Sequence, residues 1–276
     1  MEEPVTTTLN TIIASQAAWA ERHGIPFDAS FRCRSVQDNL FMPLNPHTAD
    51  EFGGGAGDEL GTPEKPGSMA SLRSSSALAV NVFDAWRGHD LAPLVPLLDV
   101  DPSADRVRFE VTYPTGLRGI PPHLDVVIDR QEGIPLAIES KFTEVYAPAH
   151  NDFRPSYFED PELWSGFERT RFLAVAIADG SEPFEYLGAA QLIKHALGLK
   201  HAHGPQGFRL LYLWYERPSE IAAAHKTEIG RFSEAVRNDF DFRATTYQEL
   251  FEDLRAGPEP RTGYVAFLDD RYSSDE

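Results

Sequence analysis

Residues 123–142 read HLDVVIDRQEGIPLAIESKF, and this stretch decides the fold. It contains two apolar runs, 123–129 and 134–142, joined by a short turn at 130–133 that includes a glycine. Turns of this length join neighbouring antiparallel strands, so the stretch predicts a β-hairpin. Both runs are too apolar to form a solvated edge, which indicates that the hairpin lies inside a larger sheet.

Charged residues interrupt this apolar hairpin. Because side chains alternate along a strand, Glu139 and Lys141 project from the same face of the second strand. The first strand contributes Asp125, which is flanked by Leu124 and Val126. Burying ionised groups costs roughly several kcal/mol per ion unless they are paired or bind a metal. The cluster therefore indicates a functional site, with a structural ion pair across the hairpin as the alternative.

Two carboxylates beside a lysine suit one kind of chemistry. Carboxylate oxygens bind Mg²⁺ or Mn²⁺, ions that keep several waters and accept phosphate oxygens. A neighbouring lysine orients a water and offsets the charge that develops on phosphorus. The cluster of Asp125, Glu139 and Lys141 therefore predicts hydrolysis of a phosphodiester by a metal-activated water, without a covalent intermediate.

Helical and strand patterns follow one another outward from the hairpin. Strict alternation at 106–113 and a nearly continuous apolar run at 208–215 predict two further strands, the second in the middle of the sheet. Helical spacing and capping residues predict helices at 7–23, 74–88, 162–179, 183–199, 219–237 and 246–255, with a short element near 264–268. Residues 43–67 are rich in Gly and Pro and predict a long, mobile loop. The predicted fold class is α/β, a mixed sheet flanked by helices.

The hairpin also resembles a known motif. Asp125 followed by Glu139-Ser140-Lys141 is similar to the signature of the PD-(D/E)xK nuclease superfamily, which has the restriction-endonuclease-like fold. In the named motif a proline directly precedes the aspartate, whereas here Pro122 lies three positions before Asp125. The order of elements from about residue 74 to 216 is similar as well. The resemblance implies a nuclease-like core at 74–216. The residue patterns outside it predict an N-terminal helix and long flexible loop at 1–73 and a C-terminal helical extension packed on the core at 217–276.

The resemblance implies a Mg²⁺-dependent (or Mn²⁺-dependent) nuclease that acts on nucleic acid, with DNA as the expected form. Asp125 and Glu139 are then the metal ligands, and Lys141 lies at the attacking water. One branch of the superfamily carries Gln-x-x-x-Tyr on the helix after the hairpin. Gln191 matches its glutamine, but His195 stands at the tyrosine position, so only Gln191 is carried over.

A fourth acidic ligand is left open by the resemblance. Many members add a glutamate on the first helix, where this chain offers Asn81 or Asp84. Glu110, on the first strand, is a further candidate. An asparagine inside an apolar helix is equally a core residue bonded to backbone, so Asn81 has both interpretations.

The histidines near the end of the predicted helix 183–199 have a simple interpretation. His195, His201 and His203 have spacings that a zinc site uses. They lie beside glycines and a lysine at a helix end, where a histidine interacts favourably with the helix dipole. We therefore expect a solvated turn here and no zinc site.

Charge argues against a nucleic-acid partner. The 276 residues include 43 Asp and Glu against 25 Lys and Arg, which gives a net charge of −18 that is spread along the chain. Nucleic acid is normally held by Lys and Arg, so this acidity favours the alternative, a catalytically silent nuclease-fold module that binds or regulates. A positive groove leading to Asp125 would favour the nuclease. The cations expected to form such a groove are Arg106, Arg108, Arg118, Arg169, Arg171 and Lys194.

The compartment follows from cysteine use and hydropathy. The single cysteine, Cys33, excludes an intramolecular disulfide framework and predicts a reducing compartment. No apolar run approaches the ~20 residues that span a bilayer, and the first residues lack the basic region of a signal peptide. We therefore expect a cytoplasmic protein without a membrane partner.

Overall fold

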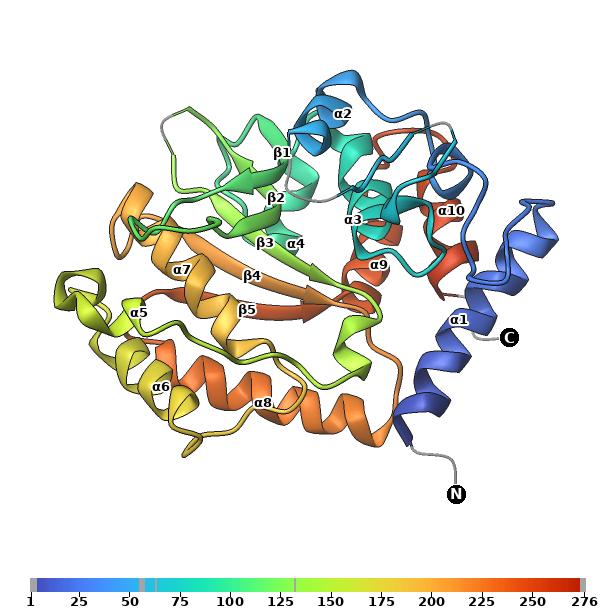
Figure 1. The fold of residues 1–276 in the computed structure, drawn as a ribbon. Helices are drawn as coiled ribbons and strands as arrows, with labels where there is room; N and C mark the ends of the chain where they lie inside the picture. The colour runs from blue at the N-terminus through green and yellow to red at the C-terminus, as the bar shows by residue number, and fades with distance from the viewer. Residues whose placement is uncertain (1–3, 55–57, 63, 132, 274–276) are drawn as a thin grey trace.

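A five-stranded mixed sheet forms the centre of the computed structural model, which describes residues 4–54, 58–62, 64–131 and 133–273 (Figure 1). The strands lie in the order β1-β2-β3-β4-β5. They are β1 (Arg106–Thr112), β2 (His123–Asp129), β3 (Leu136–Lys141), β4 (Arg209–Trp214) and β5 (Asp241–Thr246). The pairs β1–β2 and β2–β3 are antiparallel, and the pairs β3–β4 and β4–β5 are parallel. The predicted hairpin and the predicted mixed sheet are therefore confirmed.

Helices cover both faces of this sheet. The described helices are α1 (Pro4–Arg22), α2 (Pro46–Gly53), α3 (Ser75–Phe83), α4 (Val95–Leu98), α5 (Ser156–Glu159), α6 (Glu168–Ala178), α7 (Ala189–His203), α8 (Glu220–Val236), α9 (Tyr247–Ala256) and α10 (Tyr264–Leu268). In Figure 1, α7 crosses in front of the sheet. On the opposite face, Tyr247 at the start of α9 lies with its hydroxyl 2.6 Å from the Ser140 hydroxyl. Alternation along β3 therefore turns Glu139 and Lys141 toward α7 and Ser140 toward α9.

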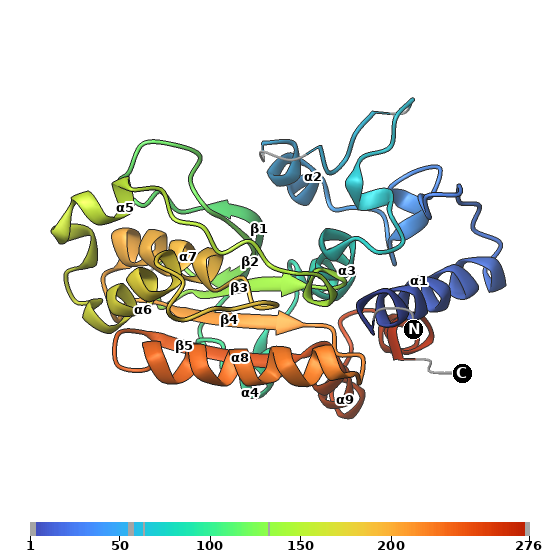
Figure 2. The ribbon, with the colours of Figure 1, turned by 60° about the horizontal axis from the view of Figure 1, so that its bottom comes forward.

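The N-terminal helix is tied to the C-terminal end of the chain. Figure 2 shows α1 at the opposite end of the molecule from α5 and α6. Its Gln16 side chain donates to the carbonyl of Arg271 at 2.9 Å and accepts from the Arg271 guanidinium at 3.1 Å. The division of the chain at residues 73/74 and 216/217 stays a prediction.

The edge strand β5 is absent from the sequence-based expectation, which gives only helices after residue 216. Its residues, DFRATT, include an exposed Arg243 and Ala244 between Phe242 and Thr246, which are buried. An edge strand buries only part of its side chains, so its pattern is weak in sequence. Residues 217–276 thus add a strand to the sheet as well as helices.

Two helix predictions and the loop prediction at 43–67 differ from the structure in their limits. The helix expected at 162–179 is interrupted near Gly166, whose φ of 76° breaks the helical path, and α6 starts at Glu168. The loop expected at 43–67 contains α2, whose first turn is capped by Asn45, and its residues 55–57 and 63 lie outside the described residues. The helix expected from Pro183 starts only at Ala189.

Glu228 explains the late start of α7. Its carboxylate accepts the backbone N–H groups of Glu185, Tyr186 and Leu187, at 2.7, 2.9 and 2.7 Å. These bonds hold the segment before α7 in a loop, because the same N–H groups would otherwise begin a helix. This loop borders the site described below.

Glu228→Ala is expected to lower the free energy of unfolding by about 3 kcal/mol, because it leaves three largely buried N–H groups without their acceptor. The measurement is urea denaturation followed by circular dichroism. The matched control is Glu234→Ala on the same helix, which removes an exposed carboxylate whose ion pair among the described residues is with the exposed Arg237. Equal midpoints for the two variants would contradict this role of Glu228.

Candidate active site

Asp125 lies where β2 separates from β3. The two strands pair at Ile128–Leu136, Val127–Ala137 and Val126–Ile138, and the described ladder ends there. Beyond that point the backbone N–H of Ser140 donates to Asp125 Oδ2 at 2.7 Å. The Asp125 carboxylate thus accepts an N–H group of β3 that a backbone carbonyl of β2 would accept if the ladder continued. This bond holds the carboxylate at the fork between the two strands.

Glu139 lies beside this fork and is 2% exposed. Its Oε1 atom is 2.6 Å from Lys141 Nζ, and its Oε2 atom is 3.0 Å from His195 Nε2 on α7. The contact to His195 does not have the alignment of a hydrogen bond, so Oε2 has no hydrogen-bond donor among the described residues. Lys141 Nζ also donates to Gln191 Oε1 at 3.2 Å. The structure therefore brings together Asp125, Glu139, Lys141 and Gln191, the four side chains selected from the sequence.

The pKa values show that this cluster has more acid than cation. Burial and the neighbouring Glu139 raise the pKa of Asp125 well above its ordinary value, against the opposing effect of Lys141. Burial by itself raises the pKa of Glu139, but Lys141 and His195 outweigh it and lower that pKa to about 2. Burial disfavours the charged form of Lys141, yet Glu139 and Asp125 raise its pKa above its ordinary value. The positive charges of the cluster thus stabilise mainly the ionised form of Glu139. Asp125 ionises readily only if another cation binds to the cluster.

His195 is a site residue that the sequence interpretation missed. It is 2% exposed and faces Glu139, so the expected solvated turn is wrong for this histidine. His201 and His203 are exposed near the end of α7. The spacing of Gln191 and His195 offers the signal, because residues four apart lie on the same face of a helix. That face of α7 is the one turned toward Glu139 and Lys141.

Asn81 and Asp84 have structural roles. Asn81 accepts the backbone N–H of Phe41 at 2.7 Å and donates to the carbonyl of Asn39 at 3.1 Å. Asp84 accepts the hydroxyl of Thr48 and a backbone N–H from the same N-terminal region. Both side chains therefore fasten the segment before α3 to the core.

Glu110, by contrast, lies next to the acidic pair. Its neighbours on β1 pair with the residues on either side of Asp125, namely Phe109 with Val126 and Val111 with Leu124. Its φ of 50° bends β1 at this point. Burial and the charges of Glu59 and Glu139 raise the pKa of Glu110 to about 7. Of the three candidates for a fourth site residue, Glu110 is the one whose charge acts on Asp125.

The donor set is compatible with a hard divalent cation. No group of three or more His, Cys, Asp or Glu side chains within the described residues is arranged to hold a metal ion. Mg²⁺, however, is bound by one or two carboxylates and keeps several waters. Such an ion would bind two carboxylates here. It would favour the ionised form of Asp125, whose pKa is raised, and it would coordinate the Oε2 atom of Glu139, which has no hydrogen-bond donor among the described residues.

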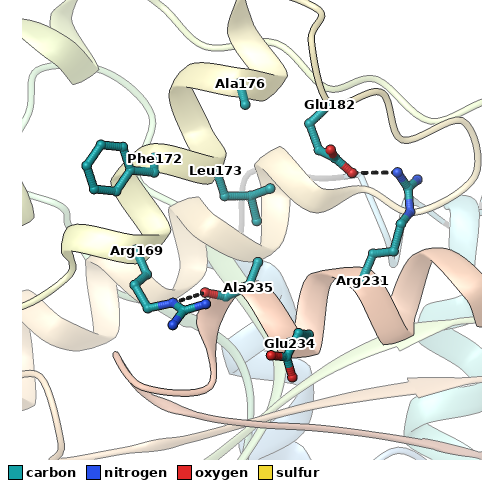
Figure 3. A pocket seen from close by; sticks show the side chains of 8 residues that line it. All are labelled: Arg169, Phe172, Leu173, Ala176, Glu182, Arg231, Glu234 and Ala235. Carbon is teal, nitrogen blue, oxygen red and sulfur yellow. Dashed lines mark hydrogen bonds and ion pairs between the residues drawn. The ribbon is translucent and has the colours of Figure 1, made fainter.

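Several of the cations expected in a groove are engaged elsewhere. Arg106 and Arg108 both form ion pairs with Asp129, at the other end of β2 from Asp125. Arg169 Nε on α6 donates to the carbonyl of Ala235 at 3.3 Å. Figure 3 shows this contact beside a cavity of about 600 Å³ between α6 and α8. None of the four side chains of the site lines that cavity.

No helix within the described parts of the chain has the length and apolar character needed to cross a bilayer.

Comparison with known proteins gives one family. Neither the curated proteins nor the solved structures give a match. The family model described as "Restriction Endonuclease associating with ARP" matches residues 13–273. That match covers nearly the whole chain, including the sheet and the side chains at the β2–β3 fork. The chain therefore belongs to this restriction-endonuclease family and, with it, to the restriction-endonuclease-like PD-(D/E)xK superfamily.

Proposed function

We propose that this protein is a metal-dependent nuclease that hydrolyses phosphodiester bonds of nucleic acid, with DNA as its substrate. The observation that carries the proposal is the fork between β2 and β3, where Asp125 and Glu139 lie beside Lys141. Membership of a restriction-endonuclease family supports it. Asp125 and Glu139 are the proposed ligands of Mg²⁺ or Mn²⁺. When bound, such an ion polarises a phosphate oxygen and lowers the pKa of a coordinated water.

Lys141 supplies a fixed positive charge in this scheme. Its ammonium group has three N–H donors, and the described contacts to Glu139 and Gln191 use two of them. The third donor is available to orient a water or to bind a phosphate oxygen. Gln191 acts through Lys141 as a positioning residue, because its amide oxygen fixes the direction of the ammonium group. His195 Nε2 lies 3.0 Å from the other oxygen of Glu139, without the alignment of a hydrogen bond.

Two exposed arginines on neighbouring segments are suited to hold a phosphate backbone. Arg118 lies on the β1–β2 loop and Arg154 on the segment before α5, and neither has an ion pair among the described residues. A Cβ atom on Gly119 would lie 2.9 Å from Arg154 Nη1, so the two segments are adjacent. Lys194 lies nearby, with its Nζ atom 2.6 Å from the carbonyl of Asp152. The net charge of the chain is −18, so a group of cations such as Arg118, Arg154 and Lys194 is an exception to its acidic composition.

Replacing both Arg118 and Arg154 with Ala is expected to weaken DNA binding and to make it less dependent on salt. Each phosphate that a cation neutralises adds about 0.9 to the slope of log affinity against log salt, so the double variant should have a slope smaller by about 2. The measurement is fluorescence anisotropy with labelled DNA across a salt series. The control is the double variant Arg73→Ala/Arg261→Ala. It removes two other exposed arginines and therefore makes the same change in net charge elsewhere on the protein. An equal reduction of slope in that control would contradict a local interaction.

The function is tested by cleavage of labelled single-stranded DNA, duplex DNA and RNA at low salt with millimolar Mg²⁺ or Mn²⁺. Low salt and divalent cation are needed because the acidic surface repels phosphate. We expect cleavage that stops when EDTA is added. If the folded, metal-loaded protein cleaves none of these substrates faster than Lys141→Ala does, the catalytically silent binding or regulatory module is preferred. The net acidity is the observation that favours that alternative.

A further inference from the structure

A cavity of about 370 Å³ opens beside the proposed site. Lys141 and Gln191, which are in contact with each other, form part of its lining. The rest comes from the segment after β3, from the loop before α7 and from β4, including Pro148, His150, Tyr186 and Tyr212. The cavity is therefore continuous with the side chains proposed to act on the phosphate.

The walls of this cavity are fixed by hydrogen bonds. The backbone N–H of Tyr186 donates to Glu228, as do those of its two neighbours. The wall that contains Pro148 is bonded directly to this loop, because the N–H of Ala149 donates to the carbonyl of Glu185 at 2.7 Å. Asn151 closes the same connection by donating to the carbonyls of Phe184 and Leu187, both at 2.9 Å. The cavity is thus preformed, which lowers the entropic cost of filling it.

Its size and its lining indicate a small, mostly apolar occupant with polar groups. Pro148, Ala149 and the half-buried Tyr186 provide apolar surface, and the buried Tyr212 also lines the cavity, close enough to Lys141 for the ammonium charge to act on it. Gln191, His150 and Glu144 provide further polar groups of the lining, and the Glu144 carboxylate also accepts the backbone N–H of Phe142 at 2.8 Å. Ligand pockets have volumes of roughly 300–1,000 Å³, so this cavity is near the lower limit and takes one nucleotide, not a base pair.

We propose that the cavity binds the unpaired base of a nucleotide next to the scissile phosphate, with Tyr186 in contact with the base. The proposal rests on the proposed nuclease function and specifies its substrate as single-stranded or locally unpaired nucleic acid. Aromatic side chains bind single strands by stacking on bases, and enzymes that place a base in a pocket take it from a single strand or out of the stack. The phosphate attached to that base would lie toward Lys141.

The experiment compares Tyr186→Ala with Tyr186→Phe, which keeps the ring. Phe172→Ala on α6 is the control, because it removes an aromatic side chain that is 76% exposed and does not line this cavity. Binding of a fluorescein-labelled single-stranded oligonucleotide is measured by anisotropy in Ca²⁺, and cleavage is measured separately in Mg²⁺. A second series carries one abasic nucleotide at each position of the oligonucleotide in turn.

Tyr186→Ala should weaken binding at least about fivefold, with Tyr186→Phe and Phe172→Ala within about twofold of the wild type. One abasic position should weaken wild-type binding by a similar factor, and Tyr186→Ala should bind intact and abasic strands equally. Equal binding by wild type and Tyr186→Ala overturns the proposal, as does a decrease that is the same for intact and abasic strands. If the wild type shows the expected binding pattern but never cleaves, the nuclease function fails while the base pocket is supported. If it cleaves and Tyr186→Ala is indistinguishable from it, only the base pocket fails.

Discussion

Replacing Asp125 with Asn is expected to weaken Mn²⁺ binding by more than about 100-fold and to abolish cleavage. Removal of a group that hydrogen-bonds to a metal ligand typically lowers metal affinity about 10–100-fold. Removal of the charge of a ligand itself should lower the affinity by more than this. Asparagine has the same shape as aspartate and can still accept the N–H of Ser140, so the fork between β2 and β3 is preserved. The variant lacks only the carboxylate charge. The measurement is calorimetric titration with Mn²⁺, alongside a cleavage assay.

Asp253→Asn is the matched control for this substitution. Asp253 is exposed on α9, so the variant makes the same change in net charge away from the fork. It should bind Mn²⁺ and cleave as the wild type does. If wild type and Asp125→Asn titrate alike, Asp125 is not a metal ligand.

Lys141→Ala is expected to reduce kcat by about 100- to 1,000-fold and to leave KM within about twofold. Those factors are typical when one group that stabilises transition-state charge is removed. A drop in kcat with little change in KM shows that the interaction of the deleted group exists mainly in the transition state. The measurement is single-turnover cleavage with saturating metal, together with nucleic-acid binding.

This variant needs a control for its effect on Glu139. Lys141 lowers the pKa of Glu139, so its removal raises that pKa. Metal binding requires an ionised carboxylate and should therefore shift to higher pH in the variant. Cleavage is compared at a pH above that shift, and Lys141→Gln retains most of the side-chain volume. If either variant keeps the wild-type kcat, Lys141 does not stabilise the transition state.

Much of the fold could be predicted from the sequence because its central strands carry strong patterns. The hairpin and β4 bury almost every side chain, and β1 alternates strictly, so each is recognisable within a few residues. The edge strand β5 buries fewer side chains and gives no such pattern. The start of α7 depends on Glu228, more than forty residues further along the chain, and local capping rules contain no information on such a contact.

The candidate site could also be predicted only as far as local sequence patterns specify it. Period-two alternation places Glu139 and Lys141 on one face of β3, and the register between β2 and β3 then brings Asp125 beside them. Their roles as ligands and catalytic group stay predictions. Gln191 and His195 reach the cluster only because α7 packs across β3, a tertiary arrangement that a sequence pattern does not specify. Glu110 joins it through a backbone bend with a φ of 50°, which few non-glycine residues adopt.

The most direct test of the central claim is an anomalous difference map from crystals soaked in Mn²⁺. We expect a peak within about 2.2 Å of one carboxylate oxygen of Asp125 and one of Glu139, the distance that hard divalent cations adopt. Crystals of Asp125→Asn should lack it. A map of a cleavage-competent protein with no peak at this pair, or with its only peak at other side chains, would contradict the assignment of the active site to the β2–β3 fork.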